Sequence, residues 1–350
     1  MTFGFMHSPV SLLSRFGFAS FRTLSRPFGG RLNMSTATPT DEYMKKLMKV
    51  EEQTPNVYRA DFLISPAGRG IAYGGLLFSQ SLQSAQHTVD RTVYAPHSMH
   101  TFFILNVDPS KSVDYRIQRV RDGRSYCTRV VQAEQEGKIV MSSQVSFCKK
   151  EESSIEHQTP MPKVPEPESL LSSVDFCREN LKKHENGEIQ LMPVSQKVME
   201  LAIQGRDDDL FEVGLRQVRP CSPNKYYGLE ESNVESMSFW VKTKCALSDD
   251  REEHRFLVAY MTDFSLASVA NRPHCSRGYI PSMILSLDHS VRFHDDDYRA
   301  DEWLLYENWS PWAKFGRAFS EGRVYTHDGR LVLSTNQESL SRTKGEKSVL

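Results

Sequence analysis

The stretch EGKIVMSS at residues 136–143 returns as DGRLVLST at residues 328–335, and this repetition decides the fold. At the same spacing of 192 residues, His97-Ser98 returns as His289-Ser290. Two separate blocks that recur at the same spacing are much less expected by chance than a single matching block. An Asp-Gly pair between apolar runs also signals a hairpin. We infer a duplicated domain, because the period is far too long for a solenoid.

Each copy reads as one helix followed by a sheet. Gly74 and Gly75 precede apolar residues at helical spacing, which end at Val89. Extended runs with short turns fill residues 98–147, as in an antiparallel sheet. The pattern predicts an α+β fold with the sheet curled around the helix. The two glycines allow close backbone approach to substrate or to a packed strand.

The copies leave room for a leader, a connection and a tail. Prolines and charges fill residues 149–170, which we interpret as a strap, and residues 171–209 are polar and end in an acidic run. We read that acidic run as a solvated loop. The predicted divisions are a targeting leader at 1–40, an N-terminal domain at 45–150, a strap and variable linker at 151–209, a C-terminal domain at 210–343 and a tail at 344–350.

The first forty residues contain four arginines, many serines and no acid. This composition is typical of a mitochondrial transit peptide, and Met34 offers a second possible start. The chain ends Ser348-Val349-Leu350, where a peroxisomal address would have a basic residue in place of Val349. We expect a mitochondrial protein, with a peroxisomal location as the alternative.

Composition excludes several other classes. The formal net charge of -1 argues against nucleic acid as a partner. No run approaches the roughly 18 apolar residues of a transmembrane segment. The six cysteines lack zinc spacing, so we expect reduced thiols and neither metal nor cofactor. His294 beside Asp295–Asp297 does not suggest a metal site, since adjacent extended residues face opposite ways.

Three polar residues of the second copy could carry chemistry. Asp263 follows an apolar run at 256–261, interpreted as a strand, and would then begin a helix, where Asp is a common cap. Ser286 lies at the start of a strand, and Gln337 lies near the end of the last one. Alone, each has an ordinary structural explanation.

Together, a carboxylate, a hydroxyl and an amide suit thioester hydrolysis. The carboxylate can orient a water and accept its proton, and the other two can fix that water or donate to the oxyanion. A thiol leaving group, with a pKa of about 8.5, needs little acid assistance. A Ser–His nucleophile is the rival, but the chain lacks the G-x-S-x-G elbow. We expect His97 and His289, being equivalent, to share a structural role.

These motifs resemble those of the type II acyl-CoA thioesterases, including the bacterial thioesterase II and peroxisomal enzymes. The similarity runs over about residues 45–342 and omits the leader and 171–209. The matching blocks are Gly74–Leu77 with Gln80–Leu82, His97–Phe103, Arg119–Tyr126 with Arg129, Glu156–Gln158 with Met161-Pro162, Leu287–Ser290 with Phe293-His294, Glu302–Tyr306, and Ser334-Thr335 with Gln337-Glu338.

The resemblance implies two fused hotdog domains that hydrolyse fatty acyl-CoA to a free fatty acid and CoA. It places the catalytic residues on Asp263, Ser286 and Gln337, which in the family hold the attacking water. Some relatives have Thr where Ser286 stands, so this chain keeps the hydroxyl and loses the methyl. Gly74, Gly75 and His97 are candidate substrate contacts. The family also implies a homo-oligomer.

Two other functions remain open. A hotdog enoyl-CoA hydratase would use an Asp/His pair near the start of the helix, yet no His follows Asp263 closely on its helix. A non-catalytic acyl-CoA-binding protein would be expected to lose Asp263 or Gln337, and both are present. Turnover of acyl-CoAs of several chain lengths would separate the three.

Overall fold

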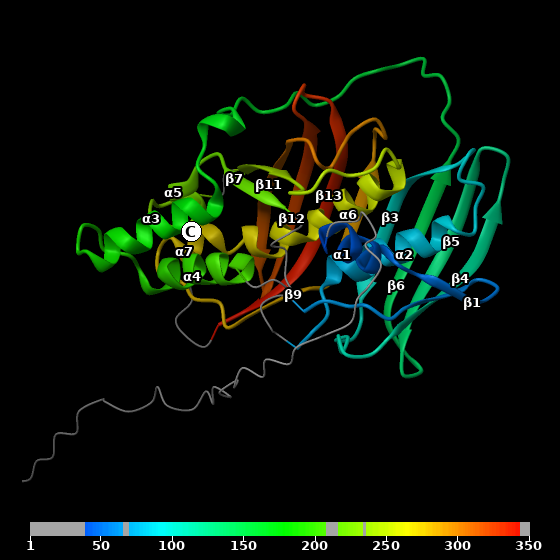
Figure 1. Cartoon of the computed structure of the whole chain (residues 1–350), viewed down its shortest axis with the longest axis horizontal. Helices are drawn as coiled ribbons and strands as arrows, with labels where there is room; N and C mark the ends of the chain where they lie inside the picture. Colours follow the sequence, from blue (N-terminus) through cyan, green and yellow to red (C-terminus); the bar gives the residue numbers. More distant parts are fainter. Residues whose placement is uncertain (1–38, 66–69, 208–215, 234–235, 344–350) are drawn as a thin grey trace, which may run out of the picture. The chain divides into compact units, whose positions relative to one another are not determined.

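An antiparallel sheet of thirteen strands organises the part of the chain that the computed structural model describes, residues 39–65, 70–207, 216–233 and 236–343 (Figure 1). The strands lie in the order β1-β2-β4-β5-β6-β3-β10-β13-β12-β11-β8-β7, and β9 pairs with β13. Their bounds are β1 Glu51–Thr54, β2 Val57–Ala60, β3 Ala95–Phe103, β4 Val113–Asp122, β5 Tyr126–Gln135, β6 Lys138–Cys148, β7 Gln217–Pro220, β8 Met237–Lys242, β9 Met283–Ser286, β10 Asp288–Phe293, β11 Leu304–Lys314, β12 Arg317–Thr326 and β13 Leu331–Arg342.

The two copies join edge to edge through β3 and β10. Met99 pairs with Val291, and these two positions are themselves equivalent, since 291 − 99 = 192. On either side of them, Ser98 pairs with Arg292 and His100 pairs with Ser290. Ser98 corresponds to Ser290 in the repeat and His100 corresponds to Arg292, so the two pairs are equivalent. A local two-fold axis therefore passes through the Met99–Val291 pair. The predicted duplication and the α+β class are confirmed as two hotdog units sharing one sheet.

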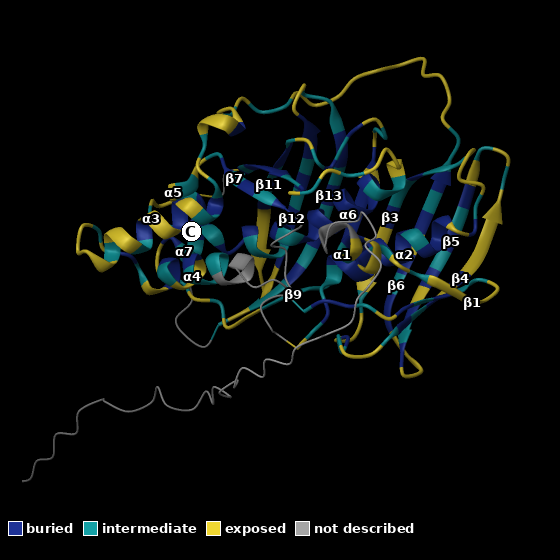
Figure 2. Cartoon of the chain, in the orientation of Figure 1, coloured by how far each residue is buried: buried dark blue, intermediate teal, exposed yellow. Residues whose placement is uncertain are grey.

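A long helix from each unit lies against the same side of this sheet, α2 (Gly74–Gln86) and α6 (Arg251–Val269) (Figure 1). The two helices also pack against each other. Ser79 Oγ donates to the carbonyl of Phe256 at 3.1 Å, and Tyr73 Oη donates to the carbonyl of Tyr260 at 3.1 Å. The partners' numbers rise on α6 as they fall on α2, so the helices run antiparallel. The core of the molecule lies between them and the sheet, as the dark blue positions in Figure 2 show.

Burial on two sides explains why α2 carries polar residues with no access to solvent. Gln80 is 0% exposed, and its amide donates to the carbonyl of Leu47 at 3.0 Å and accepts from Tyr115 Oη at 2.8 Å. A buried amide without such partners would cost free energy. These bonds fix the rotation of α2 against the sheet and against the preceding helix, α1 (Pro39–Met48).

The predicted strap contacts the second unit, and the residues predicted as a variable linker after it include two helices. Gln158 reaches the second unit, donating to the carbonyl of Gly329 at 2.7 Å, and Trp240 Nε1 donates to the carbonyl of Pro165 at 2.9 Å. Residues beyond the strap form two helices, α3 (Ser173–Glu185) and α4 (Pro193–Asp207). A short turn, η2, spans Pro167–Ser169, and two single-turn helices are α5 (Pro223–Tyr226) and α7 (Arg272–Cys275).

The physical reason for α3 was present in the sequence. Ser172 caps the helix, since its side chain accepts a bond from the backbone N–H of Asp175 at 3.1 Å. One face is buried through Phe176 and Cys177, while the other face is charged and exposed. A capped helix with a narrow apolar stripe reads as polar by composition, which is why the sequence did not indicate a helix here.

Other expectations fall at the ends of the chain. Helix α1 ends at Met48, and strand β1 follows from Glu51. Residues 1–38 of the predicted leader and residues 344–350 of the predicted tail lie outside the described residues, while residues 39 and 40 begin α1. Within the described part, no helix is both long and apolar enough to span a bilayer.

Candidate active site

Asp263 lies inside helix α6, so the prediction that it begins a helix is wrong. The helix starts twelve residues earlier, at Arg251, where Asp250 caps it by accepting from the N–H of Glu252 at 2.9 Å. The apolar run 256–261 is helix and not strand. It is buried along its whole length because α6 lies between the sheet and α2. A short, continuous apolar run fits a buried strand or a buried helix equally well.

The three candidate side chains meet at one point although they come from three elements. Gln337 lies on β13 and Ser286 on β9, and these strands pair with Ser339 opposite Ser286. Gln337 Nε2 donates to Asp263 Oδ1 at 2.7 Å and to Ser286 Oγ at 2.5 Å. Ser286 Oγ in turn donates to Asp263 Oδ1 at 3.4 Å.

The protons of this triangle can be assigned by elimination. A carboxylate only accepts hydrogen bonds, so the amide of Gln337 must turn its nitrogen toward Asp263. Both amide protons are then used, one on Asp263 and one on Ser286. Gln337 is 0% exposed, and its Oε1 has no hydrogen-bond partner among the described residues. A buried carbonyl oxygen in this state is an acceptor available to a small polar molecule.

The paired glycines bring the first helix of the other unit to the same point. A Cβ atom at Gly74 would lie 3.1 Å from Asp263 Oδ2 and 3.1 Å from the ring of Phe103. A Cβ atom at Gly75 would lie 2.7 Å from the carbonyl oxygen of Tyr260, which is too close for any other residue. Gly74 therefore approaches both the Asp263 carboxylate and strand β3, as the packed-strand alternative expected, while Gly75 approaches helix α6.

This packing places the N-terminus of α2 beside Asp263. Tyr73 occupies the cap position and makes no side-chain cap, so the N–H groups of Gly74 and Gly75 have no acceptor within their own helix. Such a helix start attracts negative charge. The arrangement can hold a water against a carboxylate on one side and offer backbone donors to a developing oxyanion on the other.

His97, the remaining candidate, is placed differently. Its Nε2 lies 2.8 Å from Ser146 Oγ, and its ring contacts Tyr126 edge to face. Burial lowers the pKa of His97 below its ordinary value. In the described structure, none of its hydrogen bonds reaches Asp263, Ser286 or Gln337, so the geometry does not bring His97 into this group.

The equivalent histidine of the second unit is closer to the group. His289 is 0% exposed, and its Nε2 lies 2.9 Å from Oγ1 of Thr262, the neighbour of Asp263. Because that hydroxyl gives its proton to the carbonyl of Ala259 at 2.7 Å, His289 Nε2 must be the donor. Burial lowers the pKa of His289, an effect that the nearby Asp263 charge opposes. His97 and His289 thus both bond a hydroxyl, but on different elements, Ser146 of β6 and Thr262 of α6.

Sequence reasoning missed the residues that hold α6 around Asp263. Tyr306 Oη donates to the carbonyl of Thr262 at 2.7 Å, and Asn308 Nδ2 donates to Ser265 Oγ at 2.7 Å. All four are buried. Their polar groups meet only across the helix–sheet interface, so no local sequence pattern predicts these hydrogen bonds. The only available sign was polar residues at alternate positions of a strand whose same face is buried.

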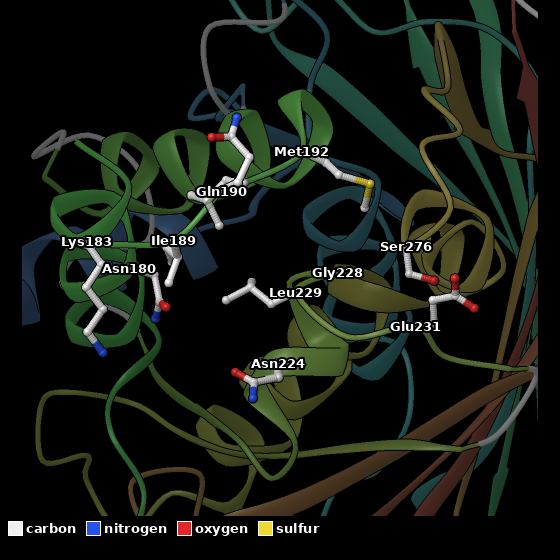
Figure 3. Close-up of a pocket in the computed structure, with 11 residues that line it drawn as sticks. Asn180, Lys183, Ile189, Gln190, Met192, Asn224, Gly228, Leu229, Glu231 and Ser276 are labelled. Carbon is white, nitrogen blue, oxygen red and sulfur yellow. The ribbon is translucent and has the colours of Figure 1, made fainter. Parts of the chain in front are cut away.

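A cavity with a volume of about 500 Å³ lies elsewhere (Figure 3). It opens among α3, α5, α7 and the segment that precedes α4. None of its lining residues is a member of the Asp263 group. The lining consists of Asn180, Lys183, Ile189, Gln190, Leu191, Met192, Asn224, Gly228, Leu229, Glu231 and Ser276.

The acidic residues near His294 face arginines. Asp296 accepts from Arg255 Nη2 at 2.9 Å, and Asp295 accepts from Arg330 Nη1 at 2.6 Å. Among the described residues, no cluster of three His, Cys, Asp or Glu side chains could hold a metal ion. The cysteines of this part of the chain form no disulfide.

Comparison with known proteins agrees with the fold. The family model of the acyl-CoA thioesterase N-terminal domain matches residues 64–148, and that of the acyl-CoA thioesterase C-terminal domain matches residues 207–341. Acyl-coenzyme A thioesterase 8 of Homo sapiens is 32% identical over 303 residues, covering 86% of this chain and 89% of that protein.

Two further relatives extend the comparison. Peroxisomal acyl-coenzyme A thioester hydrolase 1 of Saccharomyces cerevisiae is 23% identical and covers 87% of this chain and 96% of that protein. The crystal structure of the acyl-CoA thioesterase II TesB2 from Mycobacterium marinum superposes with a TM-score of 0.66 at 28% identity, covering 86% of this chain and 99% of that one. The chain therefore belongs to the acyl-CoA thioesterase family, and it is an acyl-CoA thioester hydrolase with a double hotdog fold.

Proposed function

We propose that this enzyme hydrolyses fatty acyl-CoA to a fatty acid and CoA by direct attack of one water, held by Asp263, Ser286 and Gln337. The observation that carries the proposal is the closed triangle of hydrogen bonds among these side chains. They come from three elements, and Gln337 alone lies 74 residues from Asp263.

Asp263 acts as the general base in this proposal. It is 8% exposed, so it keeps limited access to the solvent that must reach it. The water lies between Asp263 and the thioester carbonyl, and its proton passes to the carboxylate as the carbon–oxygen bond forms. Collapse of the tetrahedral intermediate then breaks the carbon–sulfur bond. CoA leaves as a thiolate, which takes up a proton.

Gln337 and Ser286 orient the water and its base. With both amide protons engaged, Gln337 Oε1 is left as a buried acceptor for one hydrogen of the water. Ser286 holds the amide from the opposite side. The first N–H groups of α2, at Gly74 and Gly75, are the donors for the oxyanion. Since α2 belongs to the first unit, both halves contribute to one site.

The hydratase alternative is less well supported by the same geometry. That chemistry needs a histidine acting together with the aspartate. Among the described residues, His289 is the histidine bonded beside Asp263, yet its Nε2 is bonded to Thr262. A non-catalytic binding role is disfavoured by the family, whose matched members carry the name thioesterase.

The test is release of free thiol from a panel of acyl-CoAs from short to long chains. Asp263→Asn keeps the size of the side chain but removes the base, and Gln337→Ala removes the amide. Each is expected to lower kcat by about 100-fold or more. His157→Asn, an exposed change on the strap, is the matched control and should leave kcat unchanged. Wild-type turnover in both site variants would refute the assignment.

We also infer an organelle address, mitochondrial with peroxisomal as the alternative. The support is the arginine-rich, acid-free composition of residues 1–40. The name of the yeast relative speaks for the alternative. Immunostaining of the untagged full chain, beside a version that begins at Met34, separates them. Loss of mitochondrial signal in the shorter version is expected, and peroxisomal signal in both would overturn the inference.

A homo-oligomer is the last part of the proposal. Its support is a group of apolar side chains on and after β3 that are about half exposed, Phe102 at 55%, Ile104 at 51% and Leu105 at 51%. Surfaces of this kind mark contacts between proteins. Light scattering on the purified full chain should give a multiple of 40.1 kDa, and Phe102→Ser should lower it. A monomer at micromolar concentration would contradict this part alone.

A further inference from the structure

One end of the second unit's sheet exposes four large apolar side chains. They are Phe315 at 78% exposure, Ile280 at 56%, Met283 at 40% and Trp312 at 39%. Single exposed apolar residues are common and need no explanation, but a group on one surface does. We call these four residues the tip patch.

The backbone brings the tip patch together from three segments. Trp312 and Phe315 belong to the β11–β12 hairpin, where Lys314 pairs with Arg317. Met283 pairs with Arg342 of β13, whose Nη1 donates to the carbonyl of Gly316 at 2.7 Å. These bonds hold the hairpin turn against the start of β9.

Ile280 joins the patch through the end of β13. Its carbonyl accepts from Thr343 Oγ1 at 3.2 Å, one residue beyond Arg342. The patch is thus anchored by hydrogen bonds on both sides of β13 and does not depend on a flexible arm.

Phe315 occupies an unfavourable backbone conformation. Its φ is +56°, and Gly316 follows with a φ of +71°. A turn with two positive φ values matches the twist of a hairpin, but Asn or Gly usually fills the first position. A bulky residue there is an outlier, and strained residues cluster at functional sites. The turn presents the Phe315 ring to solvent at a cost that Asn or Gly would avoid.

Basic side chains border the patch. Lys314 Nζ lies 5.1 Å from the centroid of the Phe315 ring, and the Arg317 guanidinium lies 5.7 Å from that of Trp312. Arg317 is paired with Glu338 at 2.5 Å. Lys314 and Arg342 form no ion pair with a carboxylate of the described residues, so the border keeps positive charge.

We propose that the tip patch docks the enzyme on an anionic lipid bilayer. Aromatic rings at a protruding turn enter the interface between headgroups and acyl chains, and lysine or arginine beside them meets anionic headgroups. The strained turn also projects one ring outward, which suits insertion into a fluid layer.

The patch lies beside the proposed site. Met283 and Ser286 are the two ends of β9, three residues apart, which is about 10 Å along a strand. Glu338, the partner of Arg317, directly follows Gln337. Acyl-CoA is amphiphilic, and a docked enzyme would hold its site near substrate dissolved in the bilayer. Docking itself does not depend on the proposed catalytic roles.

The test is cosedimentation of the full chain with sucrose-loaded vesicles of phosphatidylcholine, with and without phosphatidylserine. The double variant Trp312→Ser/Phe315→Ser should bind anionic vesicles about tenfold more weakly than wild type. Lys314→Glu should weaken binding by about fivefold or more, and more so at low salt. Binding to vesicles without phosphatidylserine should be weaker for wild type.

Matched control variants change an exposed apolar side chain and an exposed charge on the strap, away from the tip patch. Ile155→Ser removes a side chain that is 75% exposed on the strap, and Lys163→Glu reverses an exposed strap charge. Because every variant carries the same leader, differences among them report the patch. Equal binding by patch and control variants overturns the proposal. So does a fall in oligomeric mass for Trp312→Ser/Phe315→Ser, which would assign the patch to a second copy. Turnover of a short, water-soluble acyl-CoA should be unchanged in all four variants, which shows that they fold.

Discussion

Gln337 Nε2 donates to Asp263 Oδ1 at 2.7 Å, from the last strand of the sheet to the middle of a helix 74 residues earlier. This bond joins the two layers of the second unit at the point where the helix of the first unit begins. The amide N–H stabilises the charged form of Asp263, because the N–H can only donate a hydrogen bond and the carboxylate can only accept one.

Gln337→Glu converts this bond into a contact between two carboxylates. Like charges at this distance cannot both ionise freely, so the pair should share one proton near neutral pH. We expect kcat to fall by about 100-fold at pH 7 and to recover in part as pH rises and the shared proton leaves. A pH–rate profile of thiol release checks this. Gln196→Glu is the control, since Gln196 is a half-buried amide on α4 that also donates to a carboxylate, Glu200, at 3.0 Å. A profile unchanged from wild type in Gln337→Glu would contradict the bond's role.

Ser286→Thr tests the hydroxyl. Some family members have Thr here, and its extra methyl restricts χ1 and holds the oxygen in one direction. We expect activity within a few-fold of wild type or higher, whereas Ser286→Ala should lower kcat by about tenfold or more because Gln337 loses an acceptor. Steady-state kinetics on one acyl-CoA compares the two. Equal activity in Ser286→Ala and wild type would remove Ser286 from the site.

The sequence predicted the architecture because its two halves share repeated blocks. The 192-residue offset of two blocks predicted paired units, and the Met99–Val291 pair now shows how they meet. The context of Asp263 was predicted wrongly, because six apolar residues do not distinguish a strand from a helix buried on both sides. The meeting of Asp263, Ser286 and Gln337 could be expected only from resemblance. Their contact depends on β9 pairing with β13 under α6, which is a tertiary fact.

The contacts of Thr262 show the other limit. Its hydroxyl meets His289 and its carbonyl meets Tyr306, from two strands that follow it by 27 and 44 positions. Neither strand pattern nor helix pattern marks these residues, since each reads as an ordinary core position. The hydrogen-bond partners of buried polar groups are set by the tertiary fold, so a single sequence does not predict which of these residues pair.

Gly75→Ala and Gly74→Ala should separate stability from catalysis. An added Cβ at Gly75 meets the backbone of Tyr260 at 2.7 Å, so α2 and α6 must move apart. We expect the free energy of unfolding to fall by about 1–3 kcal/mol, as for overpacked cores, despite the better helix propensity of Ala. At Gly74 an added Cβ meets the Asp263 carboxylate at 3.1 Å. The rise in activation free energy derived from kcat should therefore exceed the fall in the free energy of unfolding. Urea unfolding and thiol release measure the two, and identical effects at both positions would contradict the packing described.

Acid should destabilise the enzyme through its buried and half-buried histidines before its carboxylates titrate. Burial lowers the pKa of His289, and partial burial lowers the pKa of His97 and His274. The unfolded chain, with an ordinary histidine pKa of about 6.5, therefore binds more protons than the native state just below that pH. The free energy of unfolding should be at its full value above pH 6.5 and should fall as pH drops toward the folded pKa values. Urea midpoints at pH 7.5, 6.5 and 5.5 measure this slope.

His289→Asn isolates the largest single contributor we expect, because His289 is 0% exposed and Asn keeps a donor for Thr262. The variant should be less stable than wild type at pH 7.5, yet lose less stability between pH 6.5 and 5.5. His157→Asn, on the exposed strap, should leave the slope unchanged. A wild-type slope in His289→Asn would mean that this ring does not remain neutral in the native state.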